Sequence, residues 1–89
     1  MFTKKIKRME NLREDIKQRV ISLIDEWSIK EDVNEDDDLY NDLGFDDLDF
    51  MEFVMGLEKE FGMYLPDEEI YDINTPKEFI DLIFKELEK

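Results

Sequence analysis

The chain has 89 residues and a mass of 10.8 kDa, which suffices for one small domain and excludes a barrel or a dinucleotide-binding fold. It contains neither cysteine nor histidine, which excludes disulfides, thiolate or histidine metal sites and the Ser-His-Asp mechanism. Its 12 basic and 26 acidic residues give a net charge of −14, which argues against a nucleic-acid partner because phosphates would be repelled.

Positive charge is concentrated at the N-terminus, where residues 1–20 carry seven basic and three acidic side chains. We interpret residues 1–10 as a basic N-terminal extension that either frays in solvent or docks on a partner, and residues 11–89 as the folded domain. The extension lacks the apolar region of a secretory signal, and no apolar run approaches the roughly 20 residues of a membrane span. We therefore expect a cytoplasmic protein with no membrane contact, whose acidity suits a protein partner with a basic surface.

The first helix is predicted from a stripe of apolar residues spaced three and four apart, with Asn11 as its N-cap. This stripe spans about four turns and consists of Leu12, Ile16, Val20, Leu23, Ile24 and Trp27. Residues 28–46 show no sustained period and predict a long loop, which is unusual in so small a domain and tends to be functional.

A second helix is predicted from about Leu48 to Phe61, capped by Asp46 or Asp47 and ended by Gly62. Its apolar residues form two stripes rather than one. The stripe expected to face the core consists of Phe50, Phe53, Val54, Leu57 and Phe61. The other consists of Leu48, Met51 and Met55, and it is either an exposed interaction patch among carboxylates or buried because the helix is central.

The C-terminal third predicts two further helical segments. A short helical turn is expected from Pro66 to about Tyr71. The last helix begins with a capping box, in which Thr75 is the N-cap, Pro76 the first helical residue and Glu78 the reciprocal acid. With no strand pattern present, the chain is predicted to be all-α, with three main helices and one short helix packed as a bundle.

One run of residues has a specific pattern. It contains Asp42-Leu43-Gly44-Phe45-Asp46, then Leu48-Asp49, then Glu52, Val54, Met55, Leu57, Glu58, Glu60 and Phe61, and finally Leu65-Pro66-Asp67-Glu68-Glu69. In this run the chain resembles the acyl carrier protein family. The resemblance extends from about Asn11 to Leu87, which is nearly the whole chain. The resemblance implies an acyl-carrier-type four-helix bundle without catalytic residues. It also implies a monomer of fatty acid, polyketide or related acyl metabolism that docks on acyl-handling enzymes with basic surfaces.

The chain departs from the family where its members carry 4′-phosphopantetheine on the serine of a D-S-L motif. Here the motif reads Asp46-Asp47-Leu48, and a carboxylate cannot accept the phosphodiester link of that arm. Neither Ser22 nor Ser28 can substitute, because both belong to the first helix or its end. We expect no cofactor in this form, with a phosphopantetheinyl transferase as a partner only if a parent protein has serine at position 47. Asp47 is either a natural variant or a laboratory substitution.

The resemblance also assigns the partner-binding positions to the second helix. The acidic positions are Asp46, Asp49, Glu52 and Glu58, and the apolar positions are Leu48, Met51 and Met55. Phe50 stands where the family usually has a smaller residue, and its ring would occupy part of the space in which carriers shelter an acyl chain. The alternative function is an arm-free regulatory or scaffolding partner of acyl-handling enzymes that carries no cargo.

An acidic run in the long loop invites a calcium interpretation, because it begins D-x-N-x-D at Asp32. An EF-hand loop needs glycine at its sixth position and a bidentate glutamate at its twelfth, whereas this chain has Asp37 and Leu43 there. We therefore expect no specific metal site. Nothing in the sequence indicates an independent enzyme either, because the abundant carboxylates are typical of a solvated surface.

Overall fold

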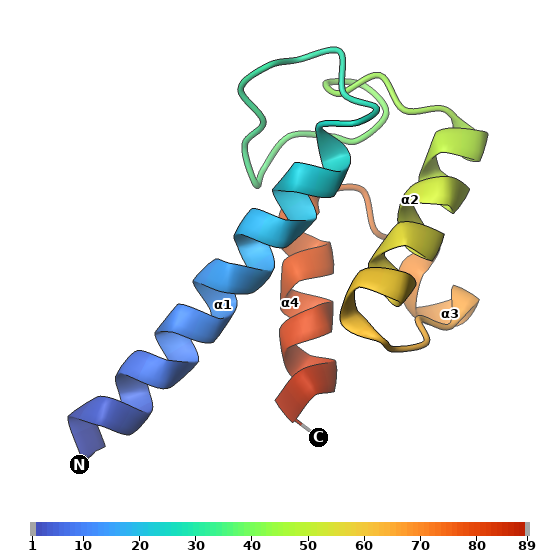
Figure 1. The fold of residues 1–89 in the computed structure, drawn as a ribbon. Helices are drawn as coiled ribbons and strands as arrows, with labels where there is room; N and C mark the ends of the chain where they lie inside the picture. The colour runs from blue at the N-terminus through green and yellow to red at the C-terminus, as the bar shows by residue number, and fades with distance from the viewer. Residues whose placement is uncertain (1, 89) are drawn as a thin grey trace.

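The computed structural model describes residues 2–88, with side chains described for residues 11–88. It shows four helices, α1 (Phe2–Ile24), α2 (Asp47–Phe61), α3 (Asp67–Ile70) and α4 (Pro76–Glu88), and no strand within the described residues. α1 packs against both α2 and α4, while the one-turn α3 lies beside the C-terminal part of α2 (Figure 1). The predicted all-α bundle of three main helices and one short helix is confirmed, and a long connector follows the first helix as expected.

α1 is longer than predicted at its N-terminal end. It begins at Phe2, so the prediction that Asn11 caps this helix is wrong. Residues 2–10 contain neither proline nor glycine and are rich in good helix formers, so nothing in them stops the helix. Ile16 and Val20 are fully buried, as their stripe predicts, whereas Leu12 is exposed. The prediction that the basic extension of residues 1–10 either frays or docks concerns side chains that lie outside the described residues.

The centre of the core is an aromatic cluster around Phe53 of α2, whose side chain is completely buried. Its ring meets Trp27, Phe45 and Phe79 edge-on, at centroid distances of 6.4, 5.8 and 5.2 Å. Edge-to-face pairs of this kind contribute stability beyond the burial of their surface. Phe53 therefore joins α2 to the end of α1, to the connector and to α4.

The connector between α1 and α2 is anchored to the helices at several points, although many of its residues are exposed. Leu39 and Leu43 are fully buried. The backbone N–H of Leu39 donates to the carbonyl of Asn74 at 2.8 Å, and the N–H of Lys77 donates to the carbonyl of Glu35 at 2.9 Å. Lys77 lies in the first turn of α4, where backbone donors lack helical partners, so the connector completes the start of that helix.

The start of α2 is a complete capping box. The Asp46 carboxylate accepts from the Asp49 backbone N–H at 2.8 Å, and the Asp49 carboxylate accepts from the Asp46 N–H at 3.2 Å. Of the two predicted caps, Asp46 is therefore the N-cap and Asp47 is the first helical residue. The helix ends at Gly62, whose φ of 60° lies in the left-handed region that glycine adopts at low cost.

The capping box predicted for α4 is also present. The Thr75 hydroxyl accepts from the Glu78 backbone N–H at 3.3 Å and donates to the Glu78 carboxylate at 3.0 Å. The same carboxylate accepts from the backbone N–H of Asn74 at 3.2 Å. These bonds fix the start of α4 and the direction in which the chain enters it.

Candidate functional site

Asp47 is exposed at the first position of α2. The surroundings of this position are negative, as the neighbouring phenol of Tyr40 shows. Partial burial raises the pKa of Tyr40, and the charges of Asp47, Asp38 and Asp46 raise it further. The position to which the sequence resemblance assigns the family's serine is therefore accessible and surrounded by carboxylates.

The second apolar stripe of α2 lies at the surface. Leu48, Met51 and Met55 are 62%, 62% and 64% exposed, so of the two alternatives left by the sequence the exposed one is observed. We call these three side chains the α2 patch. The other stripe faces inward, with Phe53, Val54 and Leu57 buried. Exposed methionines adapt their shape to different partners, which makes such a patch suitable for protein contacts.

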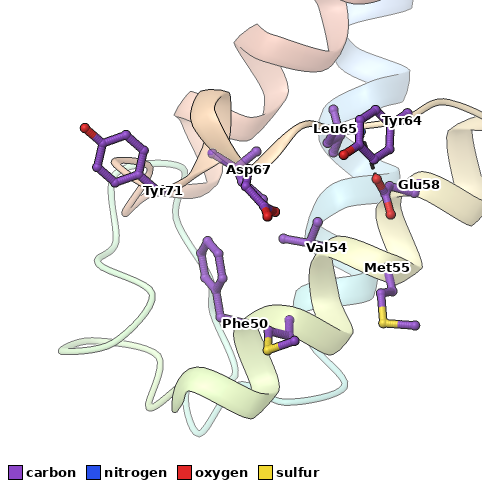
Figure 2. A pocket seen from close by; sticks show the side chains of 10 residues that line it. Phe50, Val54, Met55, Glu58, Tyr64, Leu65, Asp67 and Tyr71 are labelled. Atoms are coloured by element: carbon purple, nitrogen blue, oxygen red, sulfur yellow. Dashed lines mark hydrogen bonds between the residues drawn. The ribbon is translucent and has the colours of Figure 1, made fainter.

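The four acidic residues predicted to bind partners are not equivalent. Asp46 and Asp49 are engaged in the capping box, and Glu52 is exposed. Glu58 is partly buried, and its carboxylate accepts from the backbone N–H of Leu65 at 2.8 Å (Figure 2). Glu58 therefore holds the segment after α2 in place, a role that the sequence did not indicate.

A groove of about 280 Å³ runs between α2, α3 and the segment that joins them (Figure 2). Its apolar walls are formed by Phe50, Met51, Val54, Met55, Leu65 and Ile70. The Phe50 ring stacks on Tyr40 at 5.8 Å and contacts Phe79 at 5.8 Å, so it forms a fixed wall of the groove. The expectation that the Phe50 ring occupies part of the space in which carriers shelter an acyl chain stays a prediction.

The rim of the groove contains residues that the sequence analysis did not single out as functional. Tyr64 and Tyr71 are each 75% exposed. The Asp67 carboxylate points toward the space between Phe50 and Val54 (Figure 2). Asp67 stood out in the sequence only as part of a motif. Its position in a groove depends on how α3 packs against α2, which no local pattern reports.

Basic side chains of α1 bind the rest of the domain through ion pairs. Glu35 of the connector lies 3.2 Å from both Arg13 and Lys17, and Arg13 also lies 2.9 Å from Asp81 of α4. Partial burial acts to raise the pKa of Glu35, but hydrogen bonds from Lys17 and Arg13 outweigh it and hold the pKa below its usual value. Part of the N-terminal positive charge therefore stabilises the fold.

Replacing Glu35 with glutamine should lower the free energy of unfolding by about 1 kcal/mol at pH 7. The pKa of Glu35 is lower in the folded state than in the unfolded state. The contribution of its charge to the free energy of unfolding is therefore complete above the unfolded-state pKa, and it is lost as the pH falls through the folded-state pKa. Urea unfolding at pH 7 and pH 3 should therefore show a difference between the two proteins that shrinks at pH 3. Exposed Glu31→Gln is the control, and an equal difference at both pH values would contradict the account.

The acidic loop residues are used for local structure. The Asp37 carboxylate accepts from Lys30 Nζ at 3.0 Å and from the Asn34 N–H at 2.8 Å, and Asp38 accepts from the Tyr40 N–H at 2.9 Å. Among the residues with described side chains, no three metal-ligating groups gather as a cation site would need. No helix of the described chain is both long and apolar enough to cross a membrane.

Three long helices, a one-turn helix and a packed connector that leads into a capped helix make up a small helical domain. A family model described as the phosphopantetheine attachment site matches residues 15–83. The chain belongs to this family, which is that of the acyl carrier proteins. The resemblance found in the sequence is thereby confirmed, and an acyl-carrier-like role follows from it. Family members carry 4′-phosphopantetheine and are not themselves catalytic.

Proposed function

We propose that this chain is an acyl-carrier-like protein of fatty acid, polyketide or related acyl metabolism that carries no 4′-phosphopantetheine in this form. It docks on acyl-handling enzymes through α2. The observation that carries the proposal is the α2 patch, whose exposed apolar side chains begin one residue after Asp47. On this proposal the folded domain of residues 11–89 acts as a cytoplasmic monomer that binds neither nucleic acid nor membrane.

The residues at the start of α2 do not fit a covalent arm. Asp47 offers a carboxylate where the family has a hydroxyl, so no phosphodiester can form there. Ser22 lies within α1, and the Ser28 hydroxyl donates to the Lys30 carbonyl at 2.8 Å and accepts from the Lys30 N–H at 3.0 Å. The chain lacks a residue for the arm whether Asp47 is natural or introduced. With its present sequence it can therefore act only without the arm, as a regulatory or scaffolding partner.

The surface around the α2 patch supports docking on basic enzymes. Glu52 is exposed on α2, and Asp46 and Asp49 lie at its N-terminal end, where their side chains form the capping box. Carboxylates around an apolar centre steer a basic partner and set its register, while the apolar side chains supply most of the binding energy. Glu58 contributes negative charge from a fixed position, because its carboxylate is bound to the Leu65 backbone.

The test is binding to purified acyl-handling enzymes, namely a ketosynthase and an acyltransferase. We expect at least one to bind, and Leu48→Arg and Glu52→Lys should each raise the Kd about tenfold or more. Leu87→Arg on α4 and Glu31→Lys on the connector are matched controls at exposed positions and should change the Kd less than about twofold. Unchanged affinity in both α2 variants, or no binding to any of the enzymes, would overturn the proposal.

A further inference from the structure

Two of the three side chains in the α2 patch are methionines whose thioethers are open to solvent. Met51 and Met55 are 62% and 64% exposed, and the Met55 side chain extends outward from α2 (Figure 2). We propose that Met51 and Met55 form a reversible oxidation site, at which a peroxide converts both thioethers to sulfoxides and so weakens binding of acyl-handling enzymes. The inference rests on the proposed function and deepens it, because it assigns a means of regulation to the same surface.

The composition of the chain directs a peroxide to these sulfur atoms. The chain contains no cysteine, so no thiolate competes for the oxidant. Of the three methionines whose side chains the structure describes, Met63 is partly buried and packs against the core, whereas Met51 and Met55 are exposed. A peroxide must reach the sulfur atom to transfer its oxygen, so Met51 and Met55 should be oxidised before Met63.

The reaction transfers an oxygen atom from hydrogen peroxide to the thioether. A sulfur lone pair attacks one peroxide oxygen, so an S–O bond forms, the O–O bond breaks, and the departing hydroxide takes the remaining proton and leaves as water. The sulfur is oxidised and the peroxide is reduced. Hydrogen peroxide is uncharged, so the net charge of −14 does not repel it as it would repel an anionic oxidant. Methionine sulfoxide reductases reverse the change with electrons from a dithiol, and the oxygen leaves as water.

Oxidation at these two positions acts on binding rather than on folding. The side chains that α2 contributes to the core are Phe53, Val54 and Leu57, and neither methionine is among them. In the free protein water solvates an exposed sulfoxide, so the folded state is little affected. In a complex the apolar side chains of the partner would remove that water without donating a hydrogen bond, and burying a polar group in this way is unfavourable.

The spacing of the two methionines places both sulfoxides in the same contact. Residues four apart lie on one face of a helix, so Met51 and Met55 meet the same region of a partner. They also belong to the apolar walls of the groove between α2 and α3, so their oxidation makes both the α2 patch and one side of the groove more polar. We expect the doubly oxidised protein to bind about tenfold more weakly, or weaker still.

The test treats the purified protein with graded hydrogen peroxide and removes the peroxide with catalase before binding is measured. Peptide mass spectrometry locates each added oxygen, which Met51 and Met55 should gain before Met63. The treated protein should then bind about tenfold more weakly to the ketosynthase or acyltransferase that binds the untreated protein. Methionine sulfoxide reductases A and B with dithiothreitol should restore the affinity, and circular dichroism should show that the helices are retained.

The matched control is the double variant Met51→Leu/Met55→Leu, which keeps apolar side chains at both positions but has no sulfur to oxidise. Each protein is compared with its own untreated sample, so any effect of leucine on the affinity itself cancels. Peroxide should change the Kd of this variant less than about twofold, whereas Met63→Leu should stay as sensitive as the unchanged protein. Met51→Gln/Met55→Gln should weaken binding without any oxidant, because it introduces polar side chains at the same positions.

The outcomes separate this inference from the proposed function. If neither enzyme binds the untreated protein, the proposed function fails and the inference fails with it. If Leu48→Arg weakens binding but the protein oxidised at Met51 and Met55 binds as tightly as before, α2 docking stands and the oxidation site is overturned. Three other results would also overturn it, namely oxidation of Met63 first, loss of helical signal on oxidation, or an equal loss of affinity in peroxide-treated Met51→Leu/Met55→Leu.

Discussion

Asp47→Ser should gain one 4′-phosphopantetheine group when incubated with coenzyme A and a broad-specificity phosphopantetheinyl transferase, and the unchanged protein should gain none. The position is exposed at the start of α2, and it is the position to which the sequence resemblance assigns the family's serine. The capping box is formed by Asp46 and Asp49 and does not use the Asp47 side chain, so serine should leave the helix start intact. Intact-mass spectrometry gives an all-or-none result.

Asp47→Ala is the matched control, because it removes the same carboxylate without supplying a hydroxyl. Circular dichroism of all three proteins checks that the helices are retained. A gain of mass in the serine variant alone would show that the transferase still recognises this surface and that Asp47 is the only block. No gain in a folded serine variant would show that the chain has diverged beyond one residue, which would favour the arm-free partner role.

Phe53→Ala should lower the free energy of unfolding by about 3–5 kcal/mol, because it removes a fully buried ring and leaves a cavity. The loss also includes edge-to-face contacts with Trp27, Phe45 and Phe79, which come from three different parts of the chain. Small domains have a total stability of only about 5–15 kcal/mol, so this variant should be close to unfolding at room temperature. Urea denaturation followed by circular dichroism measures the change.

Met55→Ala is the matched control on the same helix, because Met55 is 64% exposed. Its effect on stability should stay within about 0.5 kcal/mol, as is usual for surface substitutions. If Phe53→Ala lowers the free energy of unfolding by less than about 1 kcal/mol, the aromatic cluster is not the centre of the core.

The helices from α2 onward could be predicted from sequence because their ends carry local chemistry. Asp46 precedes α2 and Gly62 follows it, while Thr75 and Glu78 bracket the start of α4. These signals act within a few residues and need no knowledge of packing. The N-terminal end of α1 was predicted wrongly because a local signal can also mislead. Asn11 has the chemistry of a cap, but the residues before it also favour a helix, and α1 continues through them.

The groove could not be predicted, because it arises from packing between α2 and α3. The spacing of apolar residues identified Met51 and Met55 as a stripe, but did not decide whether that stripe was exposed. Sequence also left Glu58 and Asp67 as members of an acidic motif. Only their placement shows that Glu58 binds the backbone of Leu65 while Asp67 faces the groove.

The backbone bonds of the connector tie the stability of distant segments together. Leu39 bonds to Asn74 just before α4, Lys77 bonds back to Glu35, and Leu43 accepts from the N–H of Ile29 at 3.1 Å. The connector cannot detach without freeing the Lys77 N–H in the first turn of α4, so local opening of either segment exposes the other. These residues should therefore exchange their amide hydrogens as one cooperative unit. A partner that clamps the start of α2 would slow exchange as far away as α4.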